Sequence, residues 1–264
     1  MKIVQETITP EKAEEYLGTM RSNRNVKPKW LAELERRINN GEWDPNNPQP
    51  ISFAGEKTLI DGQHRLLAVV GTRKTIKCWV AREVPQSAIS NIDTGKARSM
   101  ADLLRMKGEV NVAMVSGTLR QLLKYRQSGE LGQKGLEPSH FEMLELLEKE
   151  PVVRDVINAV GELRNIRLGV GPSMWGALWI LFGEQDENDA DEFIELMKTG
   201  EGLQNGSPIL ALRKALLNMQ YPRPPRHNAA LVIKAWNAWR AGEEIQTISW
   251  KAGGKSPEAF PQIR

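Results

Sequence analysis

The sequence predicts an α+β fold, in which a small N-terminal α/β module packs against a larger all-helical C-terminal domain. Strand-like segments are confined to residues 51–81, and beyond residue 98 helical patterns follow one another. The length of 264 residues, with 40% hydrophobic and 26% charged residues, is typical of a globular chain of more than one domain. We expect domains at residues 1–105 and 106–250, with a loosely held, Gly- and Pro-rich tail at 251–264.

The N-terminal module is expected to begin with a helix at Pro10. Thr9 is a typical N-cap, Pro10 fits the first helical position, and Glu11 places an acid in the first turn. A polar loop at 44–50 precedes an expected hairpin, and Asp61-Gly62 ends its second strand. The expected elements are helices at 10–20, 28–40, 63–70 and 86–92 and strands at 51–53, 58–60 and 75–81.

The C-terminal domain is expected to consist of helices that end near glycines. The stretch 174–182 is apolar on almost all sides, which predicts a helix in the core. Trp236 and Trp239 lie three residues apart and share a helix face, which favours packing over contact with nucleic-acid bases. The expected helices are 99–107, 111–127, 138–149, 151–166, 172–184, 187–199, 207–219 and 227–241.

The composition argues against several classes of protein. No apolar run approaches the roughly 20 residues of a membrane helix, and the N-terminus lacks the apolar segment of a secretory signal. The single cysteine excludes an internal disulfide framework, and three scattered histidines disfavour a structural zinc site. We therefore expect a protein of the bacterial or phage-infected cytoplasm with no membrane partner. The net charge of +3 is too small to identify a nucleic-acid partner by itself.

The loop Asp61-Gly62-Gln63-His64-Arg65 carries the densest group of functional residue types. A strand ends, Gly62 permits a tight turn, and a helix starts, so the first amides of that helix can bind an anion. Arg65 can add a charged fork for phosphate oxygens, and Gln63 and His64 add further polar groups. Asp61 can cap the helix, bond to His64 or Arg65, or bind Mg²⁺. The alternative is that Asp61 only caps the helix and Arg65 is a solvated surface residue.

Residues 61–68, which read Asp-Gly-Gln-His-Arg-Leu-Leu-Ala, resemble the phosphate-binding box of ParB-type partition proteins and the equivalent loop of sulfiredoxins. The string DGQHR is also typical of a group that includes regulators of DNA phosphorothioation clusters. Together with segments 92–98 and 235–240, it is similar to ParB-like proteins of actinobacterial phages. The resemblance implies a ParB/sulfiredoxin-like domain with Gly62, His64 and Arg65 at the phosphate. Gln63 stands where partition proteins carry a glutamate tied to nucleotide hydrolysis.

A second candidate phosphate-binding segment contains Asp93, Thr94, Lys96 and Arg98. Its Gly-Lys pair is not a P-loop, because the earlier glycine and the preceding strand are missing. The resemblance implies that this region closes over the nucleotide and its metal. Lys96 and Arg98 would then meet the same anion as Arg65. In the alternative, Asp93 and Thr94 form only a turn and the following serine caps the next helix.

Two basic segments are candidates for nucleic-acid binding. Arg21 and Arg24 lie, with Lys27, in a polar break between helices. Arg226, Lys234 and Arg240 alternate with aromatic residues near the C-terminus, a combination that suits phosphate contact and stacking. The alternatives are a solvated loop for the first segment and packing for the second.

The function expected from these features is a phage- or mobile-element-type ParB-like protein that binds nucleotide and DNA. A second hypothesis is an NTPase, a phosphotransferase or a DNA-modification enzyme. It would use Asp61, Gln63, His64 and Arg65 as catalytic residues and Asp61 and Asp93 as Mg²⁺ ligands. A third is a structural or interaction protein with a vestigial loop. The expected ligand is a nucleoside triphosphate, ATP or CTP, with Mg²⁺, and a homodimer is one open arrangement.

Overall fold

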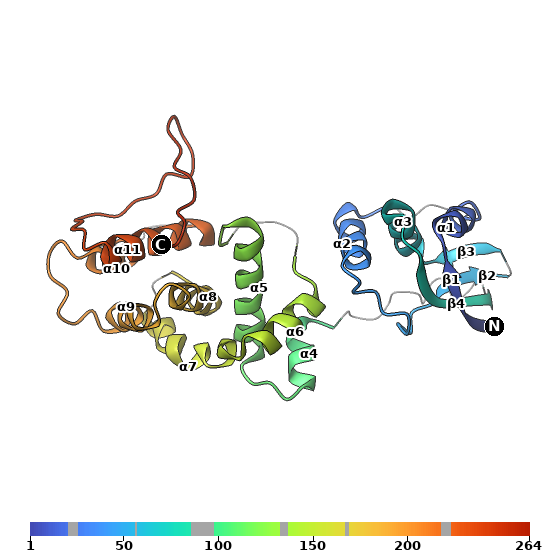
Figure 1. The fold of residues 1–264 in the computed structure, drawn as a ribbon, viewed down its shortest axis with the longest axis horizontal. Coiled ribbons are helices and arrows are strands. Elements are labelled where there is room, and N and C mark those ends of the chain that lie inside the picture. The colour runs from blue at the N-terminus through green and yellow to red at the C-terminus, as the bar shows by residue number, and fades with distance from the viewer. Residues whose placement is uncertain (21–25, 56, 86–97, 133–136, 167–168, 218–222) are drawn as a thin grey trace. The chain divides into compact units, whose positions relative to one another are not determined.

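The structure is a computed structural model of all 264 residues, which describes the chain except for residues 21–25, 56, 86–97, 133–136, 167–168 and 218–222 (Figure 1). The chain forms two compact units, unit 1 at residues 1–97 and unit 2 at residues 98–264. This division falls a few residues before the expected one, because the helix that starts at Met100 belongs to unit 2. Within the described residues, no helix combines the length and the apolar character that a membrane crossing requires.

Unit 1 contains a four-stranded mixed sheet in the order β1-β4-β2-β3. β1 is antiparallel to β4, β4 is parallel to β2, and β2 is antiparallel to β3. The expected hairpin at residues 51–61 is therefore confirmed. The elements of unit 1 are β1 (Lys2–Ile8), α1 (Pro10–Leu17), α2 (Pro28–Asn39), β2 (Ile51–Ala54), β3 (Thr58–Asp61), α3 (Gln63–Thr72) and β4 (Ile76–Val84).

Buried and exposed side chains alternate along β4, and the helices of unit 1 contribute to the same hydrophobic core as the buried ones. In β4, Ile76, Cys78 and Val80 are buried, whereas Lys77 is exposed. α3 packs between α1 and α2 (Figure 1). Their buried side chains and those of the strands make one hydrophobic cluster, so this unit has a core of its own. The predicted start of α1 is confirmed, since the hydroxyl of Thr9 accepts from the Lys12 amide.

Strand β1 was not expected from the sequence. It pairs with β4 along its whole length, from Lys2 opposite Arg82 to Ile8 opposite Ile76. Only Ile8 is fully buried, and Val4 is about half exposed, so β1 lacks a clear alternation of apolar and polar residues. Its strand character comes from pairing with a distant segment.

A polar cluster joins β1, α1 and β4. The Glu6 carboxylate accepts from Tyr16 Oη at 2.7 Å, pairs with Lys12 Nζ at 2.7 Å, and pairs with an Arg82 guanidinium nitrogen at 2.5 Å. Arg82 also donates to Tyr16 Oη and lies 5.2 Å from the centre of the Phe53 ring. The cluster supplies partners for a carboxylate whose side chain is only 15% exposed.

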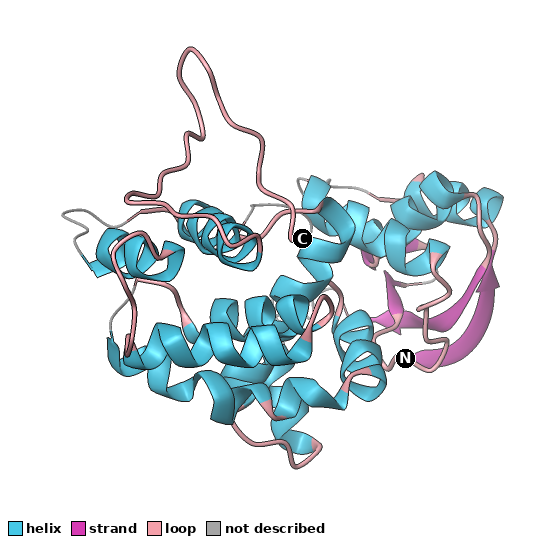
Figure 2. Ribbon diagram, turned by 60° about the vertical axis from the view of Figure 1, so that its left-hand side comes forward, coloured by secondary structure: helices cyan, strands magenta, loops and turns pink. Residues whose placement is uncertain are grey.

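Unit 2 consists of helices and loops in its described residues, and the strands lie in unit 1 (Figure 2). The expected helix at 151–166 is broken into two 3₁₀ turns and one short α-helix, and the other expected helices are confirmed with small shifts at their ends. The elements are α4 (Met100–Met106), α5 (Val112–Ser128), α6 (His140–Lys149), η2 (Pro151–Arg154), α7 (Val156–Val160), η3 (Gly161–Ile166), α8 (Pro172–Gly183), α9 (Glu187–Thr199), α10 (Pro208–Leu217) and α11 (Pro225–Arg240).

Aromatic side chains hold the centre of unit 2 together. The rings of Phe182 on α8 and Trp236 on α11 stack with centroids 4.1 Å apart, and Phe193 on α9 meets both edge-on at 5.5 Å. Trp239 packs against the same group. The predictions that 174–182 is a core helix and that Trp236 packs are therefore confirmed.

Residues 251–264 were expected to form a loosely held tail, but the end of this stretch is packed against the rest of unit 2. Residues 251–257 are exposed and Glu258 is half-buried, but Phe260 is buried in the core of unit 2. The Arg264 main-chain oxygen accepts from the Trp236 indole, and Arg264 N–H donates to Asn237. Sequence composition missed this because one buried aromatic residue and a few hydrogen bonds are enough to fix an extended segment on a helix.

The polar cluster predicts a pH dependence of unfolding. Burial on its own raises the pKa of Glu6, but hydrogen bonds from Lys12, Tyr16 and Arg82 outweigh it and hold that pKa below its ordinary value of 4.5. A carboxyl with a depressed folded pKa stabilises the fold above its unfolded pKa, and this contribution is lost as pH falls through the folded pKa.

We therefore expect the urea concentration at the unfolding midpoint of unit 1, measured in the full chain, to decrease as the pH is lowered below about 4.5. The fall should be shallower in Glu6→Gln, which removes the titrating group, and unchanged in Glu14→Gln, which alters an exposed carboxyl on α1. Identical pH profiles for wild type and Glu6→Gln would contradict the assignment. The midpoint can be followed by circular dichroism between pH 7 and pH 3.

Candidate functional site

The turn between β3 and α3 depends on Gly62. Its φ of 108° lies in the left-handed region, and a Cβ built there would come within 2.9 Å of the Ile51 side chain. The Gly62 carbonyl accepts from the Leu66 amide at 3.0 Å, so α3 begins directly after the turn. Gly62 is the N-cap, and the interpretation of Asp61 as the cap of this helix is therefore wrong.

Arg65 fixes the loop before β2 to the end of β3. Its guanidinium donates to the main-chain oxygens of Gln49 and Pro50, the latter at 3.0 Å, and pairs with Asp61 at 3.0 Å. The Arg65 side chain is only 14% exposed, so its interpretation as a solvated surface residue is wrong. Asp61 acts as the partner of Arg65, which was one of the roles that the sequence left open.

His64 connects the first turn of α3 to the first turn of α2. Its Nε2 accepts from the main-chain N–H of Lys27 at 3.0 Å. A neutral imidazole that accepts at Nε2 carries its proton on Nδ1. The bond brings the N-termini of α2 and α3 together. We call residues 27–30 and 62–65 the α2/α3 junction.

The α2/α3 junction has the electrostatics of an anion site. Lys27 is the N-cap of α2 and Gly62 is that of α3, and neither helix start has a hydrogen bond from its amides to a capping side chain. Residues 28–31 and 63–66, the two first turns, contain no acid. The first amides of a helix lack partners within it, and both helix dipoles place their positive ends here. α1, α4, α6 and α9 differ from them, because they have capping side chains and acidic first turns, with caps at Thr9, Ser99, Ser139 and Asp186. α5, α8 and α11 also lack a side-chain cap and an acidic first turn, so the distinguishing feature of the junction is that two such helix starts meet.

Lys27 was expected in a basic break between helices, whereas Lys29 was not expected to belong to this site. Both are exposed at the start of α2. A signal was present, because Pro28 marks a helix start that no acidic residue follows within the first turn. Gln63, at the first position of α3, has a buried Oε1 without a hydrogen-bond partner in the described part of the chain.

Of the other expected site residues, most of those near the junction in sequence fall outside the described residues, and one belongs to unit 2. Asp93, Thr94 and Lys96 fall outside the described residues, as do Arg21 and Arg24. Arg98 is exposed at the start of unit 2. The alternative role for the residue after it is confirmed, since Ser99 caps α4 in a reciprocal capping box with Asp102.

The expected Mg²⁺ site falls partly outside the described residues. Asp61 is paired with Arg65, and Asp93 is not described. No group of three or more His, Cys, Asp or Glu residues that could hold a metal ion occurs among the described residues.

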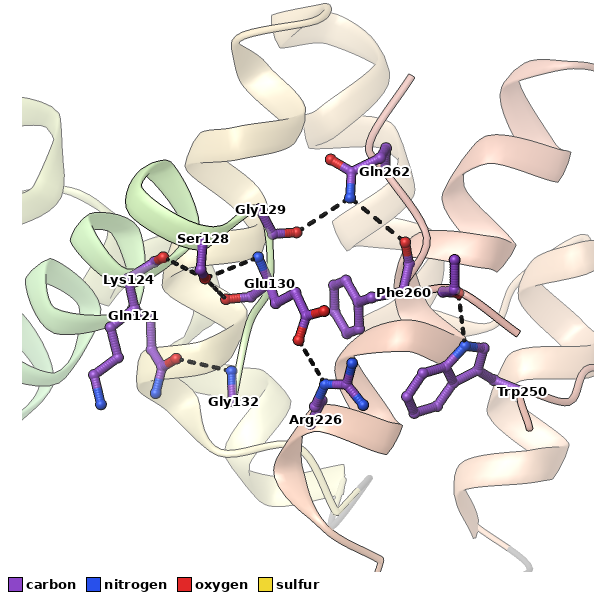
Figure 3. A network of polar contacts seen from close by, with 11 residues as sticks. Gln121, Lys124, Ser128, Gly129, Glu130, Gly132, Arg226, Trp250, Phe260 and Gln262 are labelled. Carbon is purple, nitrogen blue, oxygen red and sulfur yellow. Dashed lines mark hydrogen bonds and ion pairs between the residues drawn. The ribbon is translucent and has the colours of Figure 1, made fainter. Parts of the chain in front are cut away.

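The expected nucleic-acid-binding residues of unit 2 are engaged inside the unit. Arg226 pairs with Glu130 at 2.8 Å and lies 4.9 Å from the Trp250 ring centre, between the end of α5 and the C-terminal segment (Figure 3). Its guanidinium also lies 5.3 Å from the ring of Phe260. Arg226 therefore joins three segments of the unit, as the packing alternative predicts.

Lys234 and Arg240 on α11 are held in the same way. Lys234 Nζ pairs with Glu258 at 2.7 Å and donates to the Ser249 main-chain oxygen. Arg240 pairs with Asp189 at 2.8 Å. The charges of both cations are thus balanced by acids of unit 2, and they do not form an uncompensated basic surface.

Substitution of Gly62 should destabilise unit 1 more than substitution of another left-handed glycine. Gly55 has φ of 61° but open space around its added Cβ. We expect Gly55→Ala to cost about 1–2 kcal/mol of unfolding free energy from backbone strain alone. Gly62→Ala should cost a further ~1–3 kcal/mol from overpacking against Ile51. Equal losses in urea unfolding would show that the contact with Ile51 does not matter.

Removal of the Arg65 guanidinium should lower the stability of the fold even when no ligand is present. Arg65→Met should reduce the free energy of unfolding by about 1.5–3 kcal/mol, because two carbonyls and a carboxylate lose a charged donor. Lys77→Met removes the same charge from an exposed position on β4 and should change it little. Urea unfolding of both variants measures the difference. An unchanged free energy of unfolding in Arg65→Met would contradict the role of Arg65 in fixing the loop before β2.

Comparison with known proteins adds no assignment. No protein-family model, no curated protein and no solved structure matches the chain. The geometry of the α2/α3 junction is therefore the basis on which a function can be proposed.

Proposed function

We propose that this chain is a ParB-like protein whose unit 1 binds the phosphate groups of a nucleotide, or of DNA, at the α2/α3 junction. The observation that carries the proposal is the 3.0 Å hydrogen bond from the Lys27 amide to His64, which joins two helix N-termini without acids in their first turns. Converging amides and dipoles favour a ligand with several anionic oxygens, as a phosphate has.

The ion pair of Asp61 with Arg65 supports this proposal indirectly. A carboxylate next to an anion site would repel the ligand, but its charge is balanced by a guanidinium at 3.0 Å. Lys27 and Lys29 then remain as exposed positive charges at the junction. Arg65 is in this view a positioning residue that holds the turn, and the amides of the first turns bind the phosphate.

The same contacts favour binding over catalysis. Nε2 of His64 is occupied by the Lys27 amide, and Asp61 is paired, so neither presents a ready general base or Mg²⁺ ligand in this arrangement. The expected ligand remains a nucleoside triphosphate, and DNA is the second partner that the ParB resemblance implies.

A specific observation favours one other candidate function, a structural or interaction protein. Gly62 is required by its φ and by the closeness of Ile51, and Arg65 is required by the loop at Gln49 and Pro50. Both residues therefore stabilise the fold whether or not a ligand binds.

A charge reversal at the junction separates these candidates. Lys29→Glu should weaken binding of CTP, ATP or GTP by about tenfold or more, because a carboxylate would repel phosphate at the helix start. Stability should not fall, since an acid in the first turn interacts favourably with the helix dipole. Lys57→Glu makes the same change in net charge at an exposed position before β3, at the end opposite Asp61, and should leave affinity nearly unchanged.

Isothermal titration calorimetry of the three proteins with each nucleotide, and with duplex DNA, measures these affinities. Equal weakening in both variants would mean a general effect of charge and would contradict the site. If the wild-type chain binds none of the nucleotides and no DNA, the structural candidate is favoured.

A further inference from the structure

A cleft in unit 2 lies between α11 and the segment that follows it. Its volume is about 690 Å³, within the range of pockets that hold small molecules. One wall is the side of α11 from Lys234 to Ala241, and the other is formed by residues 245–249 and 261–264. The C-terminal segment that forms this wall runs beside α11 (Figure 1).

Two cations of the cleft are held in fixed positions. Glu258 pairs with Lys234 at 2.7 Å and Asp189 pairs with Arg240 at 2.8 Å, although neither acid belongs to the lining. Six residues of helix separate the two cations, a rise of about 9 Å. Arg240 uses Nε for Asp189 and one terminal nitrogen for the Arg264 main-chain oxygen, so further guanidinium N–H groups remain as donors.

The opposite wall adds a cation that is not engaged. The guanidinium of Arg264 has no partner among the described residues, although its main chain is fixed by Asn237 and Trp236. Thr247 and Ser249 contribute hydroxyl groups to the lining. Glu243 carries the one acidic side chain among the described residues that line the cleft.

We propose that this cleft binds a small polyanion that carries two or more phosphate or carboxylate groups. Arg264 and the remaining donors of Arg240 form the arginine forks that such groups accept in pairs. The cations are already oriented by Glu258 and Asp189, so little side-chain entropy is lost on binding. This site is independent of the α2/α3 junction and of its ligand.

The indole N–H of Trp236 is a local reporter, because it donates to the Arg264 main-chain oxygen at 3.0 Å. We would follow its NMR resonance, assigned by Trp236→Phe, during titration of the full chain with pyrophosphate and with citrate. A saturable shift is expected with at least one probe, and the stronger probe identifies phosphate or carboxylate chemistry. Absence of a saturable shift with both probes up to about 10 mM would overturn the proposal.

Arg264→Gln removes the unengaged guanidinium and should weaken binding about tenfold, because a charge-assisted contact is lost. Lys251→Gln removes one charge from an exposed position outside the lining of the cleft and should change the affinity less than twofold. Equal weakening in the two variants would refute a site at Arg264. Lys29→Glu should leave the Trp236 titration unchanged, which separates this site from the α2/α3 junction.

Discussion

The backbone of Gly62 and the side chain of Ile51 approach each other so closely that no side chain fits between them. This constraint sets the direction in which α3 leaves β3, and Arg65 secures it by holding the loop at Gln49 and Pro50. Because α3 packs between α1 and α2, the position of its first turn determines which part of α2 it meets. The contact between His64 and the start of α2 follows from that placement.

Two helix N-termini that lie close together repel each other, because the positive ends of their dipoles meet, unless a negatively charged group is nearby. At the starts of α4 and α6, the side chains of Ser99 and Ser139 cap the helix and an acid lies in the first turn. At the α2/α3 junction the nearby carboxylate of Asp61 is instead turned to Arg65. The positive ends of both helices are thus not balanced by acids of their own first turns, and the proposed phosphate binding rests on this pattern.

Unit 2 uses its basic residues differently. Arg226, Lys234 and Arg240 each pair with an acid that is distant in sequence, and together they fasten the C-terminal segment and the end of α5 to the start and side of α11. Such pairs are partly exposed, so each contributes little stability alone, and the buried aromatic residues supply most of it. Their fixed positions nevertheless orient the donors that line the cleft beside α11.

Local signals in the amino-acid sequence were enough to place most helices and strands. The N-cap at Thr9, the break at Gly62 and the apolar helix at 174–182 are local signals that depend on neighbouring residues, and the α+β character follows from them. The position of Gly62 at the start of α3, at the centre of the candidate site, was also predictable, because a tight strand-to-helix turn favours glycine.

Contacts between segments that are distant in sequence could not be predicted, because they depend on the three-dimensional fold. β1 becomes a strand by pairing with β4, Phe260 is buried by packing on unit 2, and Arg65 finds carbonyl partners about fifteen residues before it. A sequence pattern records which groups a residue can offer but not which of them are used within the fold. The pairing of Lys234 with Glu258 therefore could not be predicted, since the partner of a long charged side chain is set by the path of the chain in space.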